Sequence, residues 1–254
     1  MDISYRLNFF LRFARIFTTI LTFYFISKLF GKGASEYLKE YGGDYFPFVL
    51  IGIAFSEYIM VSLRSFSDSI RQEQIVGTLE AVLATPTKIS TIVIGSSIWD
   101  FLFASISVVA YFLLGVVFFG LDLSRMNLVS GIVILILSIF SFSGIGIISA
   151  AFILMLKKGD PLAWFMGVCF GLLGGVYFPV NIMPKTLQVF SFLVPITYSL
   201  RGLRLALLKG YSFNMLLPDI LALFIFSVLL FPIGILLFKL ALKKAKIDGS
   251  LAHY

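Results

Sequence analysis

Residues 71–86 read RQEQIVGTLEAVLATP and lie between two long apolar runs. The apolar residues of this charged stretch recur at helical spacing: Ile75, Val76, Leu79, Val82 and Leu83. The pattern predicts an amphipathic helix that stops at Thr85-Pro86, where the next helix starts. Gly77 interrupts it at a cost of about 1 kcal/mol relative to Ala, so we expect a compensating close contact with another backbone there. A short charged helix between apolar runs indicates a chain that leaves a membrane and re-enters it.

The whole chain has the composition of a membrane protein. Of its 254 residues, 59% are hydrophobic and 13% are charged, whereas soluble domains carry about 25% charged residues. The mean hydropathy is +1.02. The formal net charge of +7 does not indicate a nucleic-acid partner, because the basic residues flank the apolar runs instead of sharing one face.

Side chains that catalyse reactions or bind metals are scarce. The chain has one Cys, Cys169, and one His, His253, so we expect no His/Cys metal site and no His general base. The stretch most like a phosphate-binding loop, residues 30–33, has Ile26 where that motif requires Gly. We therefore expect no enzyme activity, no metal and no cofactor in this chain.

Six apolar segments approach or exceed the roughly 20 residues that cross a bilayer. They are residues 13–30, 46–63, 92–119, 128–156, 162–178 and 216–242. The sequence thus predicts an all-α integral membrane protein, with one transmembrane domain over residues 1–254 and six transmembrane helices. If both termini are cytoplasmic, 12 Lys and Arg residues lie inside and 8 outside, which is the bias expected for that orientation.

Two segments outside these spans are too apolar for solvated loops. Residues 1–12 combine an apolar stripe with Arg6 and Arg12, which fits either an interfacial helix or the start of the first span. Residues 179–215 contain LQVFSFLVPITYSL, which is too short to cross a bilayer. We interpret 179–215 as an outer cap of two re-entrant helices, with a helix lying flat in the interface as the alternative.

Two carboxylates and a row of glycines lie inside predicted spans. A charge at the bilayer centre costs about 2.5–3.5 kcal/mol, so Glu57 is either part of a polar transport path or bonded to another helix. For Asp100 we expect a hydrogen bond between helices. The fifth segment carries a glycine at every fourth position, a pattern that allows close helix packing within the chain or between subunits. These glycines are Gly167, Gly171 and Gly175.

Several motifs, in this order, resemble those of the type-2 membrane subunits of ATP-binding-cassette transporters, over nearly the whole chain. They are EQIVGTLEAVLATP (73–86), Gly95 and Asp100 in the third span, FPVNIMP (178–184), PITY (195–198) and RGLR (201–204). One departure is Val194 before Pro195, where the family commonly has Asn.

The resemblance implies a short coupling helix between spans two and three, within a cytoplasmic coupling region at 65–88. There a separate ATPase subunit would dock, and two copies of it would bind ATP and Mg. The residues implied in coupling are Arg71, Glu73, Gly77, Thr78, Glu80 and Pro86. A second permease subunit, identical or different, would complete the transporter in the cell (plasma or inner) membrane.

The resemblance also implies a path for substrate at the subunit interface, involving spans one, two and five. We assign Glu57, Phe178, Pro179 and Asn181 to this path, and Gly167, Gly171 and Gly175 to subunit packing. Most relatives of this compact form export drugs, lipids or lipid-linked glycans, so the expected substrate is amphipathic or hydrophobic. The alternatives are an ion- or proton-coupled secondary transporter, although residues 1–127 and 128–254 show no convincing repeat, and a membrane scaffold protein.

Overall fold

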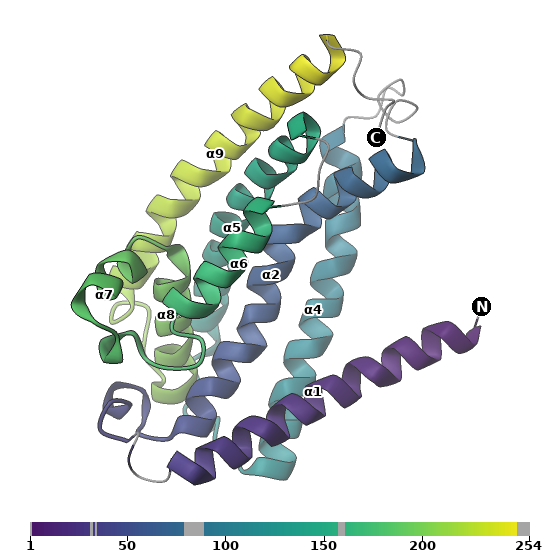
Figure 1. The fold of residues 1–254 in the computed structure, drawn as a ribbon. Coiled ribbons are helices and arrows are strands. Elements are labelled where there is room, and N and C mark those ends of the chain that lie inside the picture. Colours follow the sequence, from purple (N-terminus) through teal and green to yellow (C-terminus); the bar gives the residue numbers. More distant parts are fainter. Residues whose placement is uncertain (1, 31–32, 34, 79–88, 157–160, 248–254) are drawn as a thin grey trace.

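Long helices make up most of this computed structural model, which describes residues 2–30, 33, 35–78, 89–156 and 161–247 (Figure 1). The helical elements are α1 (Asp2–Phe30), η1 (Lys39–Tyr41), α2 (Tyr45–Val76), α4 (Ile89–Phe119), α5 (Leu128–Leu156), α6 (Pro161–Leu173), η2 (Val180–Ile182), α7 (Lys185–Phe192), α8 (Pro195–Lys209) and α9 (Leu217–Ile247). No strand occurs among the described residues, and the predicted all-α class is confirmed.

Within the described ranges, five helices are long and apolar enough to cross a membrane: α1, α2, α4, α5 and α9. The sixth predicted span, residues 162–178, is not confirmed at full length. Helix α6 has 13 residues, fewer than the roughly 20 that a span requires. It stops at Leu173, and Gly175 then adopts a φ of +69° that no α-helix accommodates.

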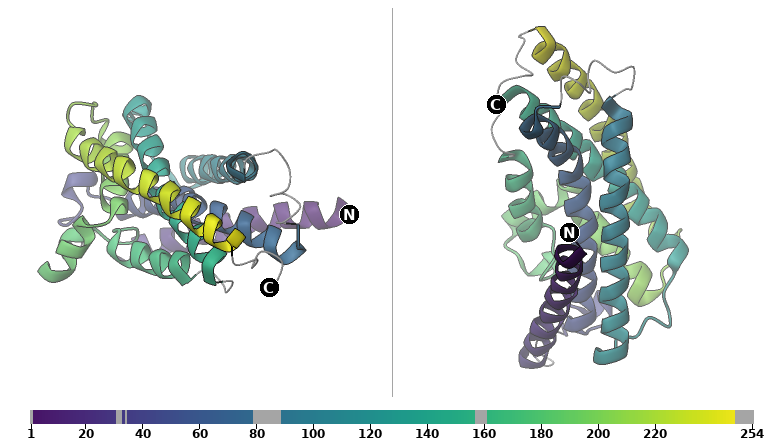
Figure 2. Two further views of the ribbon diagram at one scale, coloured as in Figure 1. Left: turned by 90° about the horizontal axis from the view of Figure 1, so that it is seen from above. Right: turned by 90° about the vertical axis from the view of Figure 1, so that its right-hand side faces the viewer.

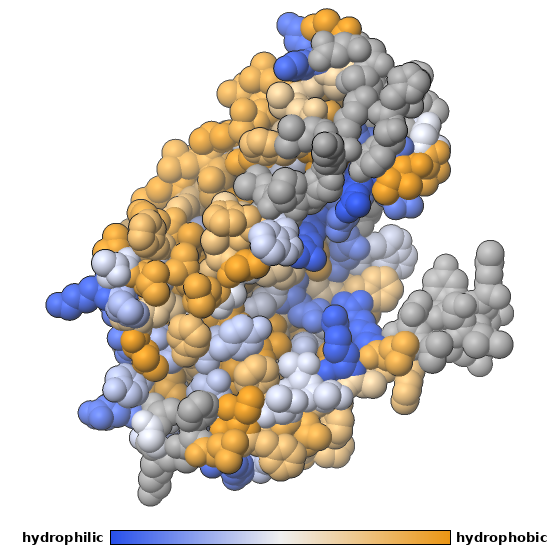
Figure 3. Space-filling view, in the orientation of Figure 1, coloured by the Kyte–Doolittle hydropathy of each residue, from blue (hydrophilic) through white to orange (hydrophobic). Residues whose placement is uncertain are grey.

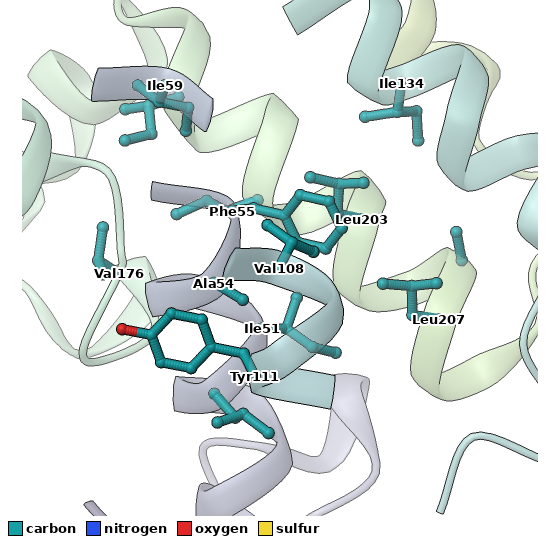
Figure 4. Close-up of a cluster of buried hydrophobic side chains, with 14 of the residues drawn as sticks. Ile51, Ala54, Phe55, Ile59, Val108, Tyr111, Ile134, Val176, Leu203 and Leu207 are labelled. Atoms are coloured by element: carbon teal, nitrogen blue, oxygen red, sulfur yellow. The ribbon is translucent and has the colours of Figure 1, made fainter. Parts of the chain in front are cut away.

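Helix α2 lies at the centre of the bundle, packed against α4, α5 and α8. Its side chains meet residues of those three helices in one apolar core (Figure 4). The core includes Ile51, Ala54, Phe55, Ile59, Val108, Tyr111, Ile134, Leu203 and Leu207. Helix α9 packs along the opposite side of α5. The face seen in Figure 3 is mostly hydrophobic, as expected of a surface that meets lipid.

Helix α1 is attached to this bundle more loosely than the other spans. In its span window 11% of residues are buried, compared with 61% for α2. It crosses the bundle obliquely, and its N-terminal part diverges from the other helices (Figures 1 and 2). Residues from Asp2 to Phe30 form one helix, and a position of residues 1–12 in the membrane interface stays a prediction.

Helix α2 continues past residue 63, where the sequence predicted its end, to Val76. Gly77 then adopts a φ of 76°, and its N–H donates to the carbonyl of Gln74 at 3.2 Å. The N–H of Thr78 donates to the carbonyl of Glu73 at 3.0 Å. This pair of bonds is the Schellman arrangement that ends many helices, and it requires a left-handed residue that is usually Gly.

The prediction of one helix through residues 71–86 is therefore wrong in its first half. Residues 71–76 are the last turns of α2, and Gly77 terminates that helix instead of interrupting it. Among the described residues, no atom lies within 4 Å of the place where a Cβ would be added to Gly77, whereas its positive φ is itself a conformation that favours glycine. Residues 79–88, which include Glu80 and Pro86, lie outside the described residues.

The bundle has two ends that differ in structure. At the first, which we call the Gly77 end, α2 and α9 finish (Figure 1). At the other, the Arg204 end, α7 and α8 fill the connection between α6 and α9. Two short helices were expected here, and Pro195 occupies the first turn of α8, where its missing N–H costs little.

Candidate functional site

Arg204 joins three elements at the Arg204 end. The residue is 2% exposed, and its Nε donates to the carbonyl oxygen of Phe48 on α2 at 3.0 Å. The two terminal nitrogens donate to the carbonyl oxygens of Gly175 and Val176 at 2.8 and 2.9 Å. Those carbonyls directly follow α6, at the negative end of its dipole. Burial lowers the pKa of Arg204 to about 9, so the guanidinium stays charged at neutral pH.

Gly52 provides the space that Arg204 needs. A Cβ at this position would lie 2.4 Å from a terminal nitrogen of Arg204 and 2.4 Å from the carbonyl oxygen of Val176. One turn earlier on the same face of α2, the Phe48 ring lies under the guanidinium, with Cζ 3.5 Å from the ring centroid. Phe48 and Gly52 thus form a seat for the buried cation.

Arg201 connects the same turn of α8 to two other elements. Its Nε donates to Glu40 at 3.3 Å, and a terminal nitrogen lies 3.9 Å from Asp219 on α9. Residues three apart on a helix project to one side, so the RGLR motif directs both arginines into the Arg204 end. Arg201 is 43% exposed, and ion pairs of that exposure contribute little to stability.

A polar cavity of about 130 Å³ lies between these arginines and the segment after α6. Its lining includes Glu40, Pro179, Asn181, Gln188 and Arg201. Two of the four predicted path residues, Pro179 and Asn181, therefore lie together here. Phe178 is half-buried just before them and does not line this cavity, nor does Glu57.

Glu57 instead lies between α2 and α1, where it pairs with two arginines. The terminal nitrogens of Arg15 and Arg12 lie 3.1 and 3.7 Å from its carboxylate oxygens. Arg12 also donates to the hydroxyl of Ser107 on α4 at 2.9 Å. A polar cluster thus connects α1, α2 and α4, and hydrophilic residues interrupt the apolar face where α1 diverges from α2 (Figure 3).

Sequence reasoning missed both sets of arginine contacts. The sequence places Arg12 in the predicted interfacial stretch 1–12 and the RGLR motif in the predicted outer cap 179–215, and neither pattern indicates which groups these arginines contact. A usable signal was present, because an unpaired Glu57 inside a span requires a partner of opposite charge. The expected hydrogen bond of Asp100 is present, since the hydroxyl of Ser65 on α2 donates to its carboxylate at 2.6 Å.

The glycine row of the fifth segment does not form one helical face. Gly167 and Gly171 belong to α6, but Gly175 follows its end with a positive φ. Among the described residues, no atom lies within 4 Å of a Cβ built at Gly171, and the atoms nearest to one at Gly167 belong to the side chains of Met60 and Arg64. The described residues therefore give no close backbone packing for this row, and packing against a second subunit stays a prediction.

At the Gly77 end, α2 finishes with a mixed polar and apolar surface. The hydroxyl of Thr78 donates to the carboxylate of Glu73, which adds a side-chain bond to the Schellman arrangement. Ile75 and Val76 are 56% and 60% exposed. Arg71 Nε and Gln74 Oε1 are buried and have no hydrogen-bond partner within the described residues.

The fold and these sites define a multi-pass membrane protein, built on apolar helices that contain a few paired charges. The chain belongs to the ABC-2 type transporter family, whose pattern matches residues 2–208. It is thus the membrane permease subunit of an ATP-binding-cassette transporter, and such subunits are not themselves catalytic. No curated protein matches the sequence.

Replacing Arg204 should destabilise the protein far more than the same replacement of Arg201. Lysine cannot reach three carbonyls or stack on Phe48 as a planar group. We expect Arg204→Lys to lower the free energy of unfolding by about 2–4 kcal/mol, since buried acceptors lose their donors. The control Arg201→Lys should cost less than about 1 kcal/mol, as expected for an exposed pair. Thermal unfolding of both variants in detergent tests this, and equal losses would contradict it.

Removing the charge of Glu57 should loosen α1. The rings of Phe17 on α1 and Phe118 on α4 have centroids 6.4 Å apart, so the two positions face each other across the α1–α4 contact. In a Cys169→Ser background with cysteines at these positions, we expect Glu57→Gln to slow their cross-linking by a short bis-maleimide severalfold. The matched control is Asp100→Asn, which removes a carboxylate between α2 and α4 that does not contact α1. Equal rates in the two variants would refute a role for Glu57 in holding α1.

Proposed function

We propose that this chain is the permease subunit of an exporter that moves an amphipathic or hydrophobic substrate such as a drug, a lipid or a lipid-linked glycan. Two ATPase subunits, which bind ATP and Mg, dock at the Gly77 end. A second permease subunit, identical or different, completes the path in the cell (plasma or inner) membrane. Family membership together with the form of α2 carries this proposal.

Helix α2 connects the two ends of the protein without a break. Its 32 residues correspond to about 48 Å at 1.5 Å per residue, well beyond the roughly 30 Å hydrocarbon layer. The excess is at the Gly77 end, where the helix leans away from the bundle (Figure 1). The hydroxyls of Ser62 and Ser69 donate to carbonyls four residues earlier, a contact that bends helices.

The Gly77 end has the surface that a protein partner requires. Ile75 and Val76 expose apolar side chains next to Arg71 and Glu73, and exposed apolar residues with charges around them mark interaction sites. A displacement of this end by the ATPase passes along α2 to the seat of Arg204. Residues Gly77, Thr78, Glu80 and Pro86 complete the proposed coupling region, 65–88.

The proposed path places Glu57, Phe178, Pro179 and Asn181 at the permease interface. Support comes from the polar cavity beside Pro179 and Asn181 and from the charged cluster at Glu57. Gly167, Gly171 and Gly175 are proposed to face the second subunit. In the proposed topology both termini are cytoplasmic, α6 and the residues after it complete a sixth crossing, and α7 and α8 form the outer re-entrant cap.

An ion- or proton-coupled secondary transporter is the alternative prediction, and membership in the ABC-2 type transporter family counts against it. One observation is compatible with it, because Glu57 is a carboxylate within a span that pairs with two arginines, and such groups can mark a substrate or ion path. Transport by reconstituted vesicles distinguishes the two candidates. ATP-driven export requires ATP and continues after the ion gradients are collapsed, whereas gradient-driven transport stops.

Reversing the charge of Glu73 should weaken the stimulation of ATP hydrolysis by substrate. We expect Glu73→Lys to leave the ATPase complexed with the permease but to lower substrate-stimulated hydrolysis about tenfold, as for one lost charged contact. Glu73→Gln is the control, because it removes the charge yet still accepts the bond from Thr78. Hydrolysis and export are measured in proteoliposomes, and full coupling in Glu73→Lys would refute docking at this residue.

The topology has its own test at the Arg204 end. Lys185 begins α7 and Lys209 ends α8, and both are exposed. In a Cys169→Ser background, cysteines at these two positions should react with a membrane-impermeant maleimide added outside intact cells. A cysteine replacing Lys243, near the end of α9, serves as the control and should react only after permeabilisation. Labelling of all three from the cytoplasmic side alone would overturn the orientation.

A further inference from the structure

An apolar groove of about 440 Å³ lies between α4 and α5, outside the sites described above. Its floor is formed by Phe55 of α2 and by Leu203 and Leu207 of α8. Phe55 and Leu203 lie near Val108 of α4 in Figure 4. The walls are aliphatic side chains such as Val109 and Leu113 of α4 and Ile132 of α5. These wall residues are also 53–60% exposed, so the groove opens onto the lipid-facing surface.

The polar side chains in the lining are hydrogen-bonded to each other and do not require a polar ligand. They are Tyr58 and Ser105, and their hydroxyls are hydrogen-bonded to each other. All other lining residues are apolar or Gly131. An occupant must therefore be apolar over most of its length, because a polar group placed here would lose its hydrogen bonds to water.

The length and depth of the groove match one half of a bilayer. Along α4 it runs from Ser105 to Val116, about 16 Å at 1.5 Å per residue, close to half of the roughly 30 Å hydrocarbon layer. One end reaches the α4–α5 connection through Leu123 and Met126. The other end, at Ser105, lies near the middle of the span 97–119.

A helix from a second copy of the chain does not fit whole inside this groove. A helix with its side chains is about 10–12 Å across, which requires several times the volume of this groove. A single acyl chain is narrow enough, and 440 Å³ falls within the range of about 300–1,000 Å³ that holds small ligands.

Basic residues lie in the chain next to lining residues at one end of the groove. Arg125 is exposed between the lining residues Leu123 and Met126, and within the described residues no carboxylate lies within ion-pair distance of it. Asp122 is the carboxylate nearby in sequence, and it accepts the backbone N–H of Ser124 at 2.9 Å. Lys209 is exposed beside Gly210, where an added Cβ would lie 2.2 Å from the carbonyl oxygen of Arg125.

We propose that this groove binds one acyl chain of a resident membrane phospholipid whose phosphate is held by Arg125. The chain fills the space between α4 and α5, down to the Tyr58–Ser105 pair. The inference depends on membership in a multi-pass membrane family and not on export, on the ATPase or on the direction of transport.

The test uses the full chain in nanodiscs of phosphatidylcholine with phosphatidylglycerol that carries a photoactivatable diazirine on one acyl chain. Peptides containing residues 105–116 and 128–135 should be labelled, and labelling should saturate and be competed by unlabelled phosphatidylglycerol. Val109→Trp fills the groove and should lower this labelling severalfold. Its matched control is Ile106→Trp, on the same helix and 47% exposed but outside the lining, and it should label as the native chain does.

Arg125→Gln tests the phosphate contact separately. We expect about tenfold weaker competition by unlabelled phosphatidylglycerol, the loss of one charge-assisted bond. Labelling of the native chain that rises linearly with lipid, or equal labelling in the two tryptophan variants, would overturn the lipid site. Unchanged competition in Arg125→Gln would overturn the phosphate contact. Intact labelling together with failed export would instead count against the proposed function alone.

Discussion

The buried guanidinium of Arg204 is the contact on which the Arg204 end depends. A charge withdrawn from water is tolerated only if its hydrogen bonds are replaced, and here three carbonyl oxygens and the face of Phe48 replace them. The partners belong to two distant places in the chain, Phe48 on α2 and Gly175-Val176 after α6, so the cation is satisfied only when α2, α8 and the segment after α6 have all assembled. One side chain thereby holds the segment after α6 close to Gly52.

This contact also gives α2 its place in the mechanism we propose. Near its first turn the helix is held through the carbonyl of Phe48, and some 25 residues later it ends in the Glu73–Thr78 arrangement. A movement at one end of a continuous hydrogen-bonded helix must appear at the other unless the helix bends. The hydroxyl of Ser69, whose bond to the carbonyl of Ser65 is of a kind that bends helices, lies near the Gly77 end. In the proposed mechanism a displacement of this end is therefore partly a change of angle and partly a translation.

Composition and hydropathy were sufficient to predict the helical class, five of the spans and the two short helices before α9. The reason is that a helix must be apolar over roughly 20 residues to cross the bilayer, and this requirement is visible in the sequence. They were insufficient where a single contact or backbone angle determines where a helix ends or which residues pair. The sequence predicted that Gly77 interrupts a helix, because its positive φ, which ends α2, is visible only in the backbone. Gly175 fitted a four-residue repeat, but Arg204 binds its carbonyl after the helix has ended. Glu57 indicated that a partner existed without indicating that α1 provides it.

The two sides of α2 are held by different chemistry, and this difference separates a rigid part from a movable one. On the α5 side, a Cβ at Gly146 would lie 2.5 Å from the carbonyl of Ser62, so backbones touch and sliding would cause clashes. On the α1 side, the contacts described above are the Glu57 ion pairs, which can exchange partners at low cost, and 11% of the α1 span window is buried. Ion pairs of this kind tolerate rotation. We infer that α2 and α5 move together as one body in the proposed mechanism, and that α1 changes its contacts with them.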